Sequence, residues 1–283
     1  MTCTPAELMI VAMAREIEDG DCLAQGIGTT MPACAYFLAK HTHAPNCVFL
    51  YSVGGAYSTR MAPLTLTRLE ELALGSPICR ASYSEIVCEH LPGMRFKEFS
   101  RPAQVDEYGN TNNVMVRTPS GTELRLPGVG GIPDFSGYES HQAYLYLPRQ
   151  DALTLVPRLD VCSGVGANGG LPRERARVAA SGAGTRKLVT DLAVIGFSRE
   201  GATILSMHPG VTAAQVQERC GFPLRIAEGA GETPLPTRED LRLIRDIIDP
   251  SGIRELEMLP GRQRAERVRA IVRAEAAERG ARP

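Results

Sequence analysis

CVFLYSVGGAYS, residues 47–58, is the segment from which the fold is most readily inferred. Its first half is apolar at consecutive positions, which is typical of a strand covered on both faces in a parallel sheet. Gly54 and Gly55 then end the strand with a turn. Residues 21–30 have the same form, an apolar strand followed by a glycine loop, and residues 31–42 have the pattern of a helix. Strand, glycine turn, helix and strand in this order predict the βαβ unit of an α/β protein.

The rest of the chain continues the alternation of strands and helices. Thr4, Pro5 and Glu7 predict the start of an N-terminal helix through a capping box with proline at the first helical position. Further strands are expected at 143–148 and 153–164 and on both sides of a turn at 198–201, and helices over 212–222 and 237–250. We expect one domain over residues 1–253 and a charged helical tail over residues 254–283.

Composition narrows the class of protein. The chain has 283 residues, 43% of them hydrophobic and 22% charged, as in ordinary globular proteins. A net charge of -1 argues against nucleic acid or an anionic membrane as a partner. No apolar run reaches the roughly 18 residues of a membrane span, and residues 1–20 lack the basic region of a signal peptide. The scattered cysteines, without a C-x-x-C pair, indicate reduced thiols, so a cytoplasmic location is expected.

Two glycine loops are candidate binding elements. GIGTT, residues 26–30, could hold a phosphate at a helix N-terminus, but it lacks the spacing of a dinucleotide fingerprint, so no nicotinamide cofactor is expected. GVGG contributes Gly128, Gly130 and Gly131. Its glycines either serve a tight turn or leave backbone N–H groups free to bind an oxyanion or a thioester carbonyl.

Polar groups cluster in DEYGNTN, residues 106–112. Asn110 and Asn112 either complete a turn that satisfies its own backbone or point into a cleft, and the local sequence leaves both interpretations open. His41, His43 and Cys47 match the spacing of a metal site only loosely, so no metal is expected. His208, between an apolar strand and a turn, is interpreted as structural.

Seven stretches in a fixed order carry a family resemblance. They are GIGTTMP, APNCVFLYSVGG, QVDEYGNTN, LPGVGG, VCSGVGANGGLPRER, MHPGVTAAQVQERCGF and LPTREDLRLIRDIIDP. Together they resemble the β-subunit of family I coenzyme A transferases, of the glutaconate CoA-transferase type, over roughly residues 5–253. The resemblance implies an open, mostly parallel α/β sheet with helices on both faces, shared with ribose-phosphate isomerases and glucosamine-phosphate deaminases.

The resemblance also implies partners and a reaction. An α-subunit of similar fold would complete a heterodimer or heterotetramer, with the active site at the interface. Coenzyme A would enter as a thioester substrate, and no permanently bound cofactor is implied. In the family reaction a glutamate attacks the acyl-CoA and becomes a glutamyl-CoA thioester, which is covalent catalysis by a carboxylate.

That glutamate is missing. Matching APNC and the strand after it places Ser52 at its position, and no Asp or Glu occurs between Asp21 and Glu70. A serine would need an adjacent base to act as nucleophile. The family that this sequence resembles includes members without this glutamate. They are hydrolases that open a carbon ring in a steroid-derived acyl-CoA or decarboxylases of a glutaconyl-type acyl-CoA. The segments around residues 207–212 and 235–250 particularly resemble the ring-cleaving group.

Three functions follow for this chain. The first is hydrolysis or C–C cleavage of an acyl-CoA with an α-subunit. The others are genuine CoA transfer with a nucleophile from elsewhere and a non-catalytic scaffold subunit. Under the first, Ser52, Gly54 and Gly55 would contact the acyl group. The amides of Asn110 and Asn112 would donate hydrogen bonds in the cleft, and the glycines of the GVGG loop would let the backbone approach the thioester.

Overall fold

The computed structural model describes residues 2–26, 28–51, 54–68, 75, 77–118, 120–137, 142–167 and 184–280. The chain divides into two compact units. The first is formed by Met1–Tyr83 together with Leu235–Pro283, and the second by Ser84–Pro234. Residues 254–283, expected as a charged helical tail, group with the first unit, and helix α10 (Gly261–Gly280) lies among them.

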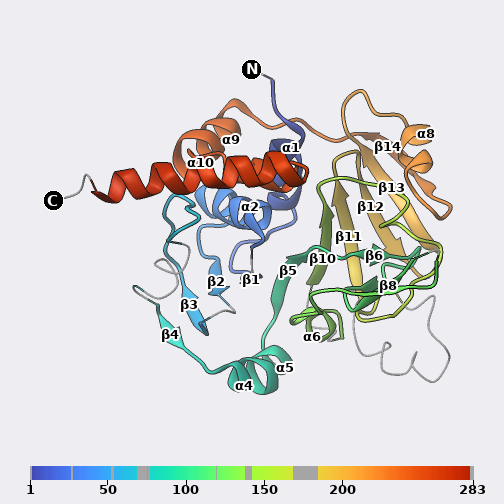
Figure 1. Cartoon of the computed structure of the whole chain (residues 1–283), viewed down its shortest axis with the longest axis horizontal. Helices are drawn as coiled ribbons and strands as arrows, with labels where there is room; N and C mark the ends of the chain where they lie inside the picture. The colour runs from blue at the N-terminus through green and yellow to red at the C-terminus, as the bar shows by residue number, and fades with distance from the viewer. Residues whose placement is uncertain are drawn as a thin grey trace. The chain divides into compact units, whose positions relative to one another are not determined.

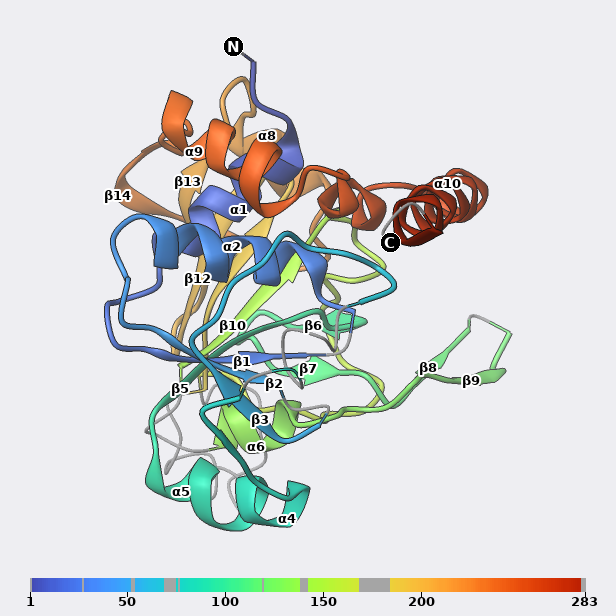
Figure 2. The same ribbon diagram turned by 90° about the vertical axis from the view of Figure 1, so that its left-hand side faces the viewer.

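The first unit contains the βαβ arrangement that the opening stretch predicts. Its elements are α1 (Pro5–Ala14), β1 (Cys22–Gln25), α2 (Thr30–His41), β2 (Val48–Tyr51), β3 (Ala56–Ser58), β4 (Cys79–Arg80), α9 (Arg238–Arg242), η2 (Leu243–Ile248), η3 (Ile253–Glu257) and α10 (Gly261–Gly280). Strands β1 and β2 are parallel, whereas β2, β3 and β4 pair in antiparallel order. Figure 2 shows α1, α2 and α9 stacked on one side of these strands.

The predicted start of α1 is confirmed in detail. Pro5 occupies the first turn, the Thr4 side chain accepts from the Glu7 amide, and the Glu7 side chain accepts from the Thr4 amide. Helix α1 is buried on nearly all sides, which explains its continuously apolar sequence. Below it, the rings of Phe37 and Phe49 meet edge to face at 5.1 Å and join α2 to β2.

The second unit is built around a larger sheet. Its strands are β5 (Phe96–Ser100), β6 (Gln104–Val105), β7 (Thr111–Asn112), β8 (Met115–Arg117), β9 (Glu123–Arg125), β10 (Gln142–Leu147), β11 (Thr185–Thr190), β12 (Ala193–Ser198), β13 (Gly201–Met207) and β14 (Arg225–Glu232). Its helices are α4 (Tyr83–Glu85, which begins at the unit boundary), η1 (Ile86–His90), α5 (Leu91–Gly93), α6 (Ile132–Gly137) and α8 (Ala213–Glu218). Figure 1 shows the long strands β10 to β14 side by side.

Strand order in this sheet is β14-β13-β12-β11-β10-β5. Strands β5, β10 and β11 are parallel neighbours, and the hairpin β12–β13 is antiparallel with Ser198 opposite Gly201, as the turn signal predicts. The core beneath the sheet is formed by buried apolar side chains that include Leu145, Leu188 and Ile204.

The prediction of a strand over residues 153–164 is wrong. In this range Leu155 forms an isolated bridge with Val105, and Gly164 forms one with Thr111. Pro157 has no N–H to donate to a ladder and interrupts any regular pairing. The segment instead follows the small hairpin β6–β7 and supplies single backbone bonds to it.

Candidate functional site

The tip of β2 is the position where the family resemblance places the reaction. Tyr51 is the last residue of β2, and Ser52 lies outside the described residues. Gly54 and Gly55 form the turn into β3 with φ angles of 110° and 59°, which favour glycine. A β carbon on Gly55 would collide with the carbonyl oxygen of Ala81, whose amide donates to the Gly55 carbonyl at 2.8 Å. The turn therefore requires these glycines for its own geometry.

A small apolar pocket lies at the carboxyl ends of β1 and β2. It is lined by Gln25, Ala33, Tyr36, Phe37, Phe49, Tyr51 and Leu64. Its volume of about 10 Å³ leaves room for about one water molecule. Burial raises the pKa of Tyr51 to about 12, so the phenol stays neutral and cannot act as a base at neutral pH.

The N-terminus of α2, which follows the GIGTT loop, is already occupied. Glu257 is buried, and its Oε1 accepts from the Met31 amide at 3.0 Å and from the Thr30 hydroxyl at 2.9 Å. Gln25 binds the preceding turn by donating to the carbonyl and hydroxyl of Thr29. A carboxylate of the chain itself thus takes the place where an anionic phosphate would bind.

Asn110 completes a turn from the inside. Its Nδ2 donates to both carboxylate oxygens of Asp106, at 3.1 and 2.9 Å, and its Oδ1 accepts from the Gly166 amide at 2.8 Å. Asp106 also accepts from the amide of Tyr108. Asn110 is 2% exposed. The geometry therefore favours the turn interpretation of this residue over the cleft interpretation.

Asn112 is equally internal. It is fully buried, and its Nδ2 donates to Gln104 Oε1 and to the Met115 carbonyl, both at 2.7 Å. Its Oδ1 accepts from the Val114 amide at 3.0 Å. Both asparagines therefore shape the hairpin β6–β7 and the turn that leads into β8.

A second, larger cavity lies within the second unit, where β5 and β10 end. Its volume is about 410 Å³. It is lined by Arg101, Pro102, Ala103, Asn113, Pro127, Gly128, Leu147, Pro148, Arg149, Asp151 and Thr154. Ligands of open α/β sheets bind at the carboxyl ends of parallel strands, which is the edge where this cavity lies.

The GVGG loop reaches this cavity through its first glycine. Gly128 has a φ of 112°, and its amide donates to the carbonyl of Asn113 at 3.0 Å. Gly130 has a φ of 54° and leads through Gly131 into α6, and neither of these two lines the cavity. The structure thus joins Gly128 to the segment after β7 and leaves the other two glycines in the turn.

Charged residues of both signs line the cavity, and the positive ones outnumber the negative one. Arg101 and Arg149 contribute guanidinium groups, and Asp151 contributes the carboxylate. Asp151 is engaged by the amides of Leu153 and Thr154 at 3.0 and 2.8 Å. Guanidinium groups bind phosphate oxygens in a bidentate manner, so the cavity suits an anionic ligand.

Glu98, on β5, is a titratable group that the sequence did not single out. Its Oε2 is buried without a hydrogen-bond partner in the described structure, and burial raises the pKa of the carboxyl to about 8. A carboxyl of this kind can hold a proton at neutral pH. In the sequence it is one charged residue of the ordinary strand pattern FKEFS, and no local feature distinguishes it.

His208 and His43 have structural contacts. His208 is buried, with Nδ1 3.0 Å from the Thr233 hydroxyl and Nε2 2.8 Å from the Thr190 carbonyl, and burial lowers its pKa. This confirms the structural interpretation. His43 contacts the Ile17 carbonyl through Nε2 at 3.0 Å. The described residues contain no cluster of three or more metal-ligating side chains.

Comparisons with known proteins agree on one family. The model of the family described as coenzyme A transferase matches residues 6–219. A subunit of the 3-oxoadipate CoA-transferase of Pseudomonas knackmussii is 33% identical over 247 residues, which cover 85% of this chain and 92% of that protein. The IpdB subunit of the cholesterol ring-cleaving hydrolase of Rhodococcus jostii is 31% identical over 157 residues, which cover 55% of this chain and 60% of that protein.

The fold agrees with solved structures as well. The decarboxylase AibA/AibB is similar with a TM-score of 0.76 at 27% identity, covering 90% of this chain and 98% of that chain. This similarity confirms the predicted class, an open α/β sheet. None of the helices in the described residues has the length and apolar character that crossing a membrane requires.

Proposed function

Because the chain belongs to the coenzyme A transferase family, we propose that it is the β-subunit of a heteromeric enzyme that hydrolyses an acyl-CoA or cleaves a C–C bond in it. The observation that carries the proposal is the missing carboxylate. Between Asp21 and Glu70 the chain has no Asp or Glu, so the tip of β2 cannot provide the carboxylate that CoA transfer uses.

The surroundings of the strand tip support this reaction class. The pocket beside Tyr51 is mostly apolar, and the half-buried Tyr51 phenol is neutral. None of the described residues that line it is a base that could take a proton from a serine hydroxyl. Ser52, Gly54 and Gly55 would therefore contact the reacting acyl group without forming a covalent bond to it.

The α-subunit would supply the general base that activates water or moves a proton. The names of the two relatives, both described as subunits, and the two-component name of the decarboxylase AibA/AibB support a heteromer. A heterodimer and a heterotetramer both satisfy this requirement.

Taken by itself, the cavity of the second unit suits a phosphate-bearing ligand such as coenzyme A. Arg101 and Arg149 would contact phosphate oxygens, and Gly128 would let the backbone approach the ligand. Gly130 and Gly131 would give the same loop its turn. Asn110 and Asn112 would act indirectly, by holding the neighbouring loop in shape.

CoA transfer is the second candidate function. It is favoured by the relative that matches along nearly its whole length, which is named as part of a CoA-transferase. In that case the nucleophile would come from the α-subunit. A scaffold subunit without a role in turnover is the third.

Substitution of Ser52 tests the proposal. In the complex with its α-subunit, Ser52→Ala should keep a kcat within about threefold of the wild type, because the hydroxyl forms no bond to the substrate. The exposed Ser120→Ala is the matched control. A loss of about 100-fold or more in Ser52→Ala alone, with an acyl-enzyme detected by mass spectrometry, would contradict non-covalent chemistry.

A further inference from the structure

We propose that Glu275 is a positioning residue, which holds Leu64 as a wall of the apolar pocket at the tip of β2 and thereby restricts the size of the acyl group. The consequence for substrates rests on the proposed function. The positioning itself does not, because it follows from contacts within the first unit alone.

Glu275 is unusual for a residue of α10. Most of this helix is exposed, yet Ile271 and Glu275 are 4% and 3% exposed. A buried carboxylate is costly unless it receives hydrogen bonds. Burial raises the pKa of Glu275, but its bonds to Thr67 and Leu66 outweigh this, so the pKa is lowered overall. The carboxylate is therefore ionised and fully engaged at neutral pH.

The partners of Glu275 lie in one short segment after β3. Its Oε1 accepts from the Leu66 amide at 2.8 Å, and its Oε2 accepts from the Thr67 amide at 2.9 Å and the Thr67 hydroxyl at 2.6 Å. The bonds cross 208 or 209 residues of sequence and contact consecutive amides. Such charge-assisted bonds fix the backbone of an irregular segment.

Leu64 is two residues before this contact. It is 3% exposed and lines the apolar pocket together with Gln25 and Tyr51. Its amide donates to the Ile248 carbonyl at 2.7 Å. Leu64 therefore forms one wall of the pocket at Tyr51, the residue that directly precedes Ser52 in the sequence.

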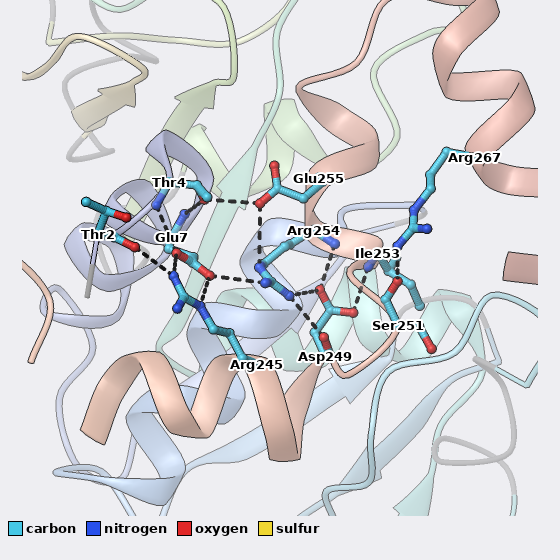
Figure 3. A network of polar contacts seen from close by, with 10 residues as sticks. All are labelled: Thr2, Thr4, Glu7, Arg245, Asp249, Ser251, Ile253, Arg254, Glu255 and Arg267. Carbon is cyan, nitrogen blue, oxygen red and sulfur yellow. Dashed lines mark hydrogen bonds and ion pairs between the residues drawn. The ribbon is translucent and has the colours of Figure 1, made fainter. Parts of the chain in front are cut away.

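The η2–η3 region, whose Ile248 carbonyl binds the Leu64 amide, is held by buried ion pairs. Glu7, fully buried, accepts from Arg245 at 2.7 Å and from Arg254 at 3.1 Å, as Figure 3 shows. Arg254 also binds Asp249 at 2.9 Å, next to the carbonyl that Leu64 uses. Removing one partner from such a buried network leaves an unpaired charge, so the network resists displacement.

Helix α10 is also bonded to the η2–η3 region. Arg267 donates to the Ser251 carbonyl at 2.8 Å (Figure 3). Glu275 is therefore held at a fixed place relative to the η2–η3 region, and the Leu66–Thr67 backbone follows it. This region lies beyond residue 219, where the match to the family model ends, so the proposed restriction comes from a segment outside that match.

With a volume of about 10 Å³, the pocket gives a bulky acyl group less room than it needs, and a shift of the Leu64 side chain would provide more. Removing the Glu275 carboxylate releases the Leu66–Thr67 backbone, so the Leu64 side chain can shift even while its amide still donates to the Ile248 carbonyl. We therefore expect Glu275→Ala to favour bulky over short acyl-CoAs. Leu64→Ala, which enlarges the pocket directly, should change the preference in the same direction.

The experiment has two measurements on the heteromeric complex of wild type, Glu275→Ala, Glu275→Gln and Leu64→Ala. Glu278→Gln, on the exposed face of the same helix, is the matched control. Hydrogen exchange should show the Leu66 and Thr67 amides exchanging at least about tenfold faster in Glu275→Ala, and the control unchanged. This measurement does not involve substrate and is independent of the reaction catalysed.

The second measurement is the ratio of kcat/KM for a branched or ring-bearing acyl-CoA to that for acetyl-CoA or another short thioester. The ratio should rise about tenfold in Glu275→Ala and Leu64→Ala. This ratio can be measured whether the enzyme catalyses hydrolysis, cleavage or CoA transfer. It therefore tests the role of Glu275 even if the proposed function is wrong. Unchanged exchange in Glu275→Ala and Glu275→Gln would overturn the positioning role, and an unchanged ratio in both alanine variants would overturn the effect on acyl size.

Discussion

Glu257 accepts a hydrogen bond from the backbone amide of Met31 at 3.0 Å, although 226 residues separate the two in the sequence. Helix α2 has no side-chain cap from its own N-terminal residues, and this distant carboxylate takes that role. The C-terminal segment therefore completes the βαβ unit from which the fold begins, because α2 is the crossover helix between β1 and β2.

Glu257→Ala should destabilise the protein by about 2 kcal/mol, because it removes a charged cap and leaves the Met31 amide without its partner. Urea denaturation at neutral pH measures this as a lower midpoint. Glu266→Ala is the control, since Glu266 is exposed and pairs with Arg262 on the surface, where about 0.5 kcal/mol or less is expected. Equal midpoints in the two variants would contradict the capping role.

Glu98 should make stability depend on pH. The folded carboxyl, with a pKa raised from 4.5 to about 8, keeps its proton over a range where the unfolded chain has released it. The folded state then binds more protons, so stability should fall as the pH rises from about 4.5 to about 8. Glu98→Gln should flatten this part of the profile and stabilise the protein at pH 8.

Denaturation midpoints at several pH values between 5 and 8.5 check this, with the exposed Glu228→Gln as the control that should keep the wild-type slope. If Glu98→Gln kept that slope too, another group would have to account for it.

Arg149→Gln should weaken binding of coenzyme A and its thioesters. We expect KM to rise about tenfold with kcat nearly unchanged, because the guanidinium would contact phosphate oxygens that take no part in the reaction. Steady-state kinetics and calorimetry with free coenzyme A provide the measurement. Arg199→Gln, in the exposed turn between β12 and β13, is the control. A loss of kcat at constant KM would place Arg149 in the chemistry instead.

Much of the fold could be predicted from local signals. The apolar run before Gly54, the capping box of Thr4 and Glu7 and the turn at Ser198–Gly201 each depend on residues close in sequence. Strand β14 could not be predicted from local signals. Its residues, Arg225–Glu232, include glycines, are mostly exposed and show no apolar alternation. It is a strand because it pairs with β13.

The candidate site was predicted less completely, for a physical reason. Arg101 and Arg149 follow different strands, and only the parallel pairing of β5 with β10 brings the two strand ends together. Glu275 and Leu66 likewise meet across 209 residues. Conversely, Asn110 and Asn112 have the composition of binding residues, but the turn uses their polar groups internally. The sequence shows which polar side chains are present, but it does not show which groups they contact.

The products that the heteromeric complex forms decide whether this family member acts without transferring CoA. The purified α- and β-subunits would receive a panel of short, dicarboxylic and ring-bearing acyl-CoAs, each with and without acetate or succinate, and mass spectrometry would identify the products. The proposed function predicts water addition, ring opening or loss of carbon dioxide at the same rate with or without an acceptor. A new thioester of the acceptor, formed only when that acceptor is present, would contradict it.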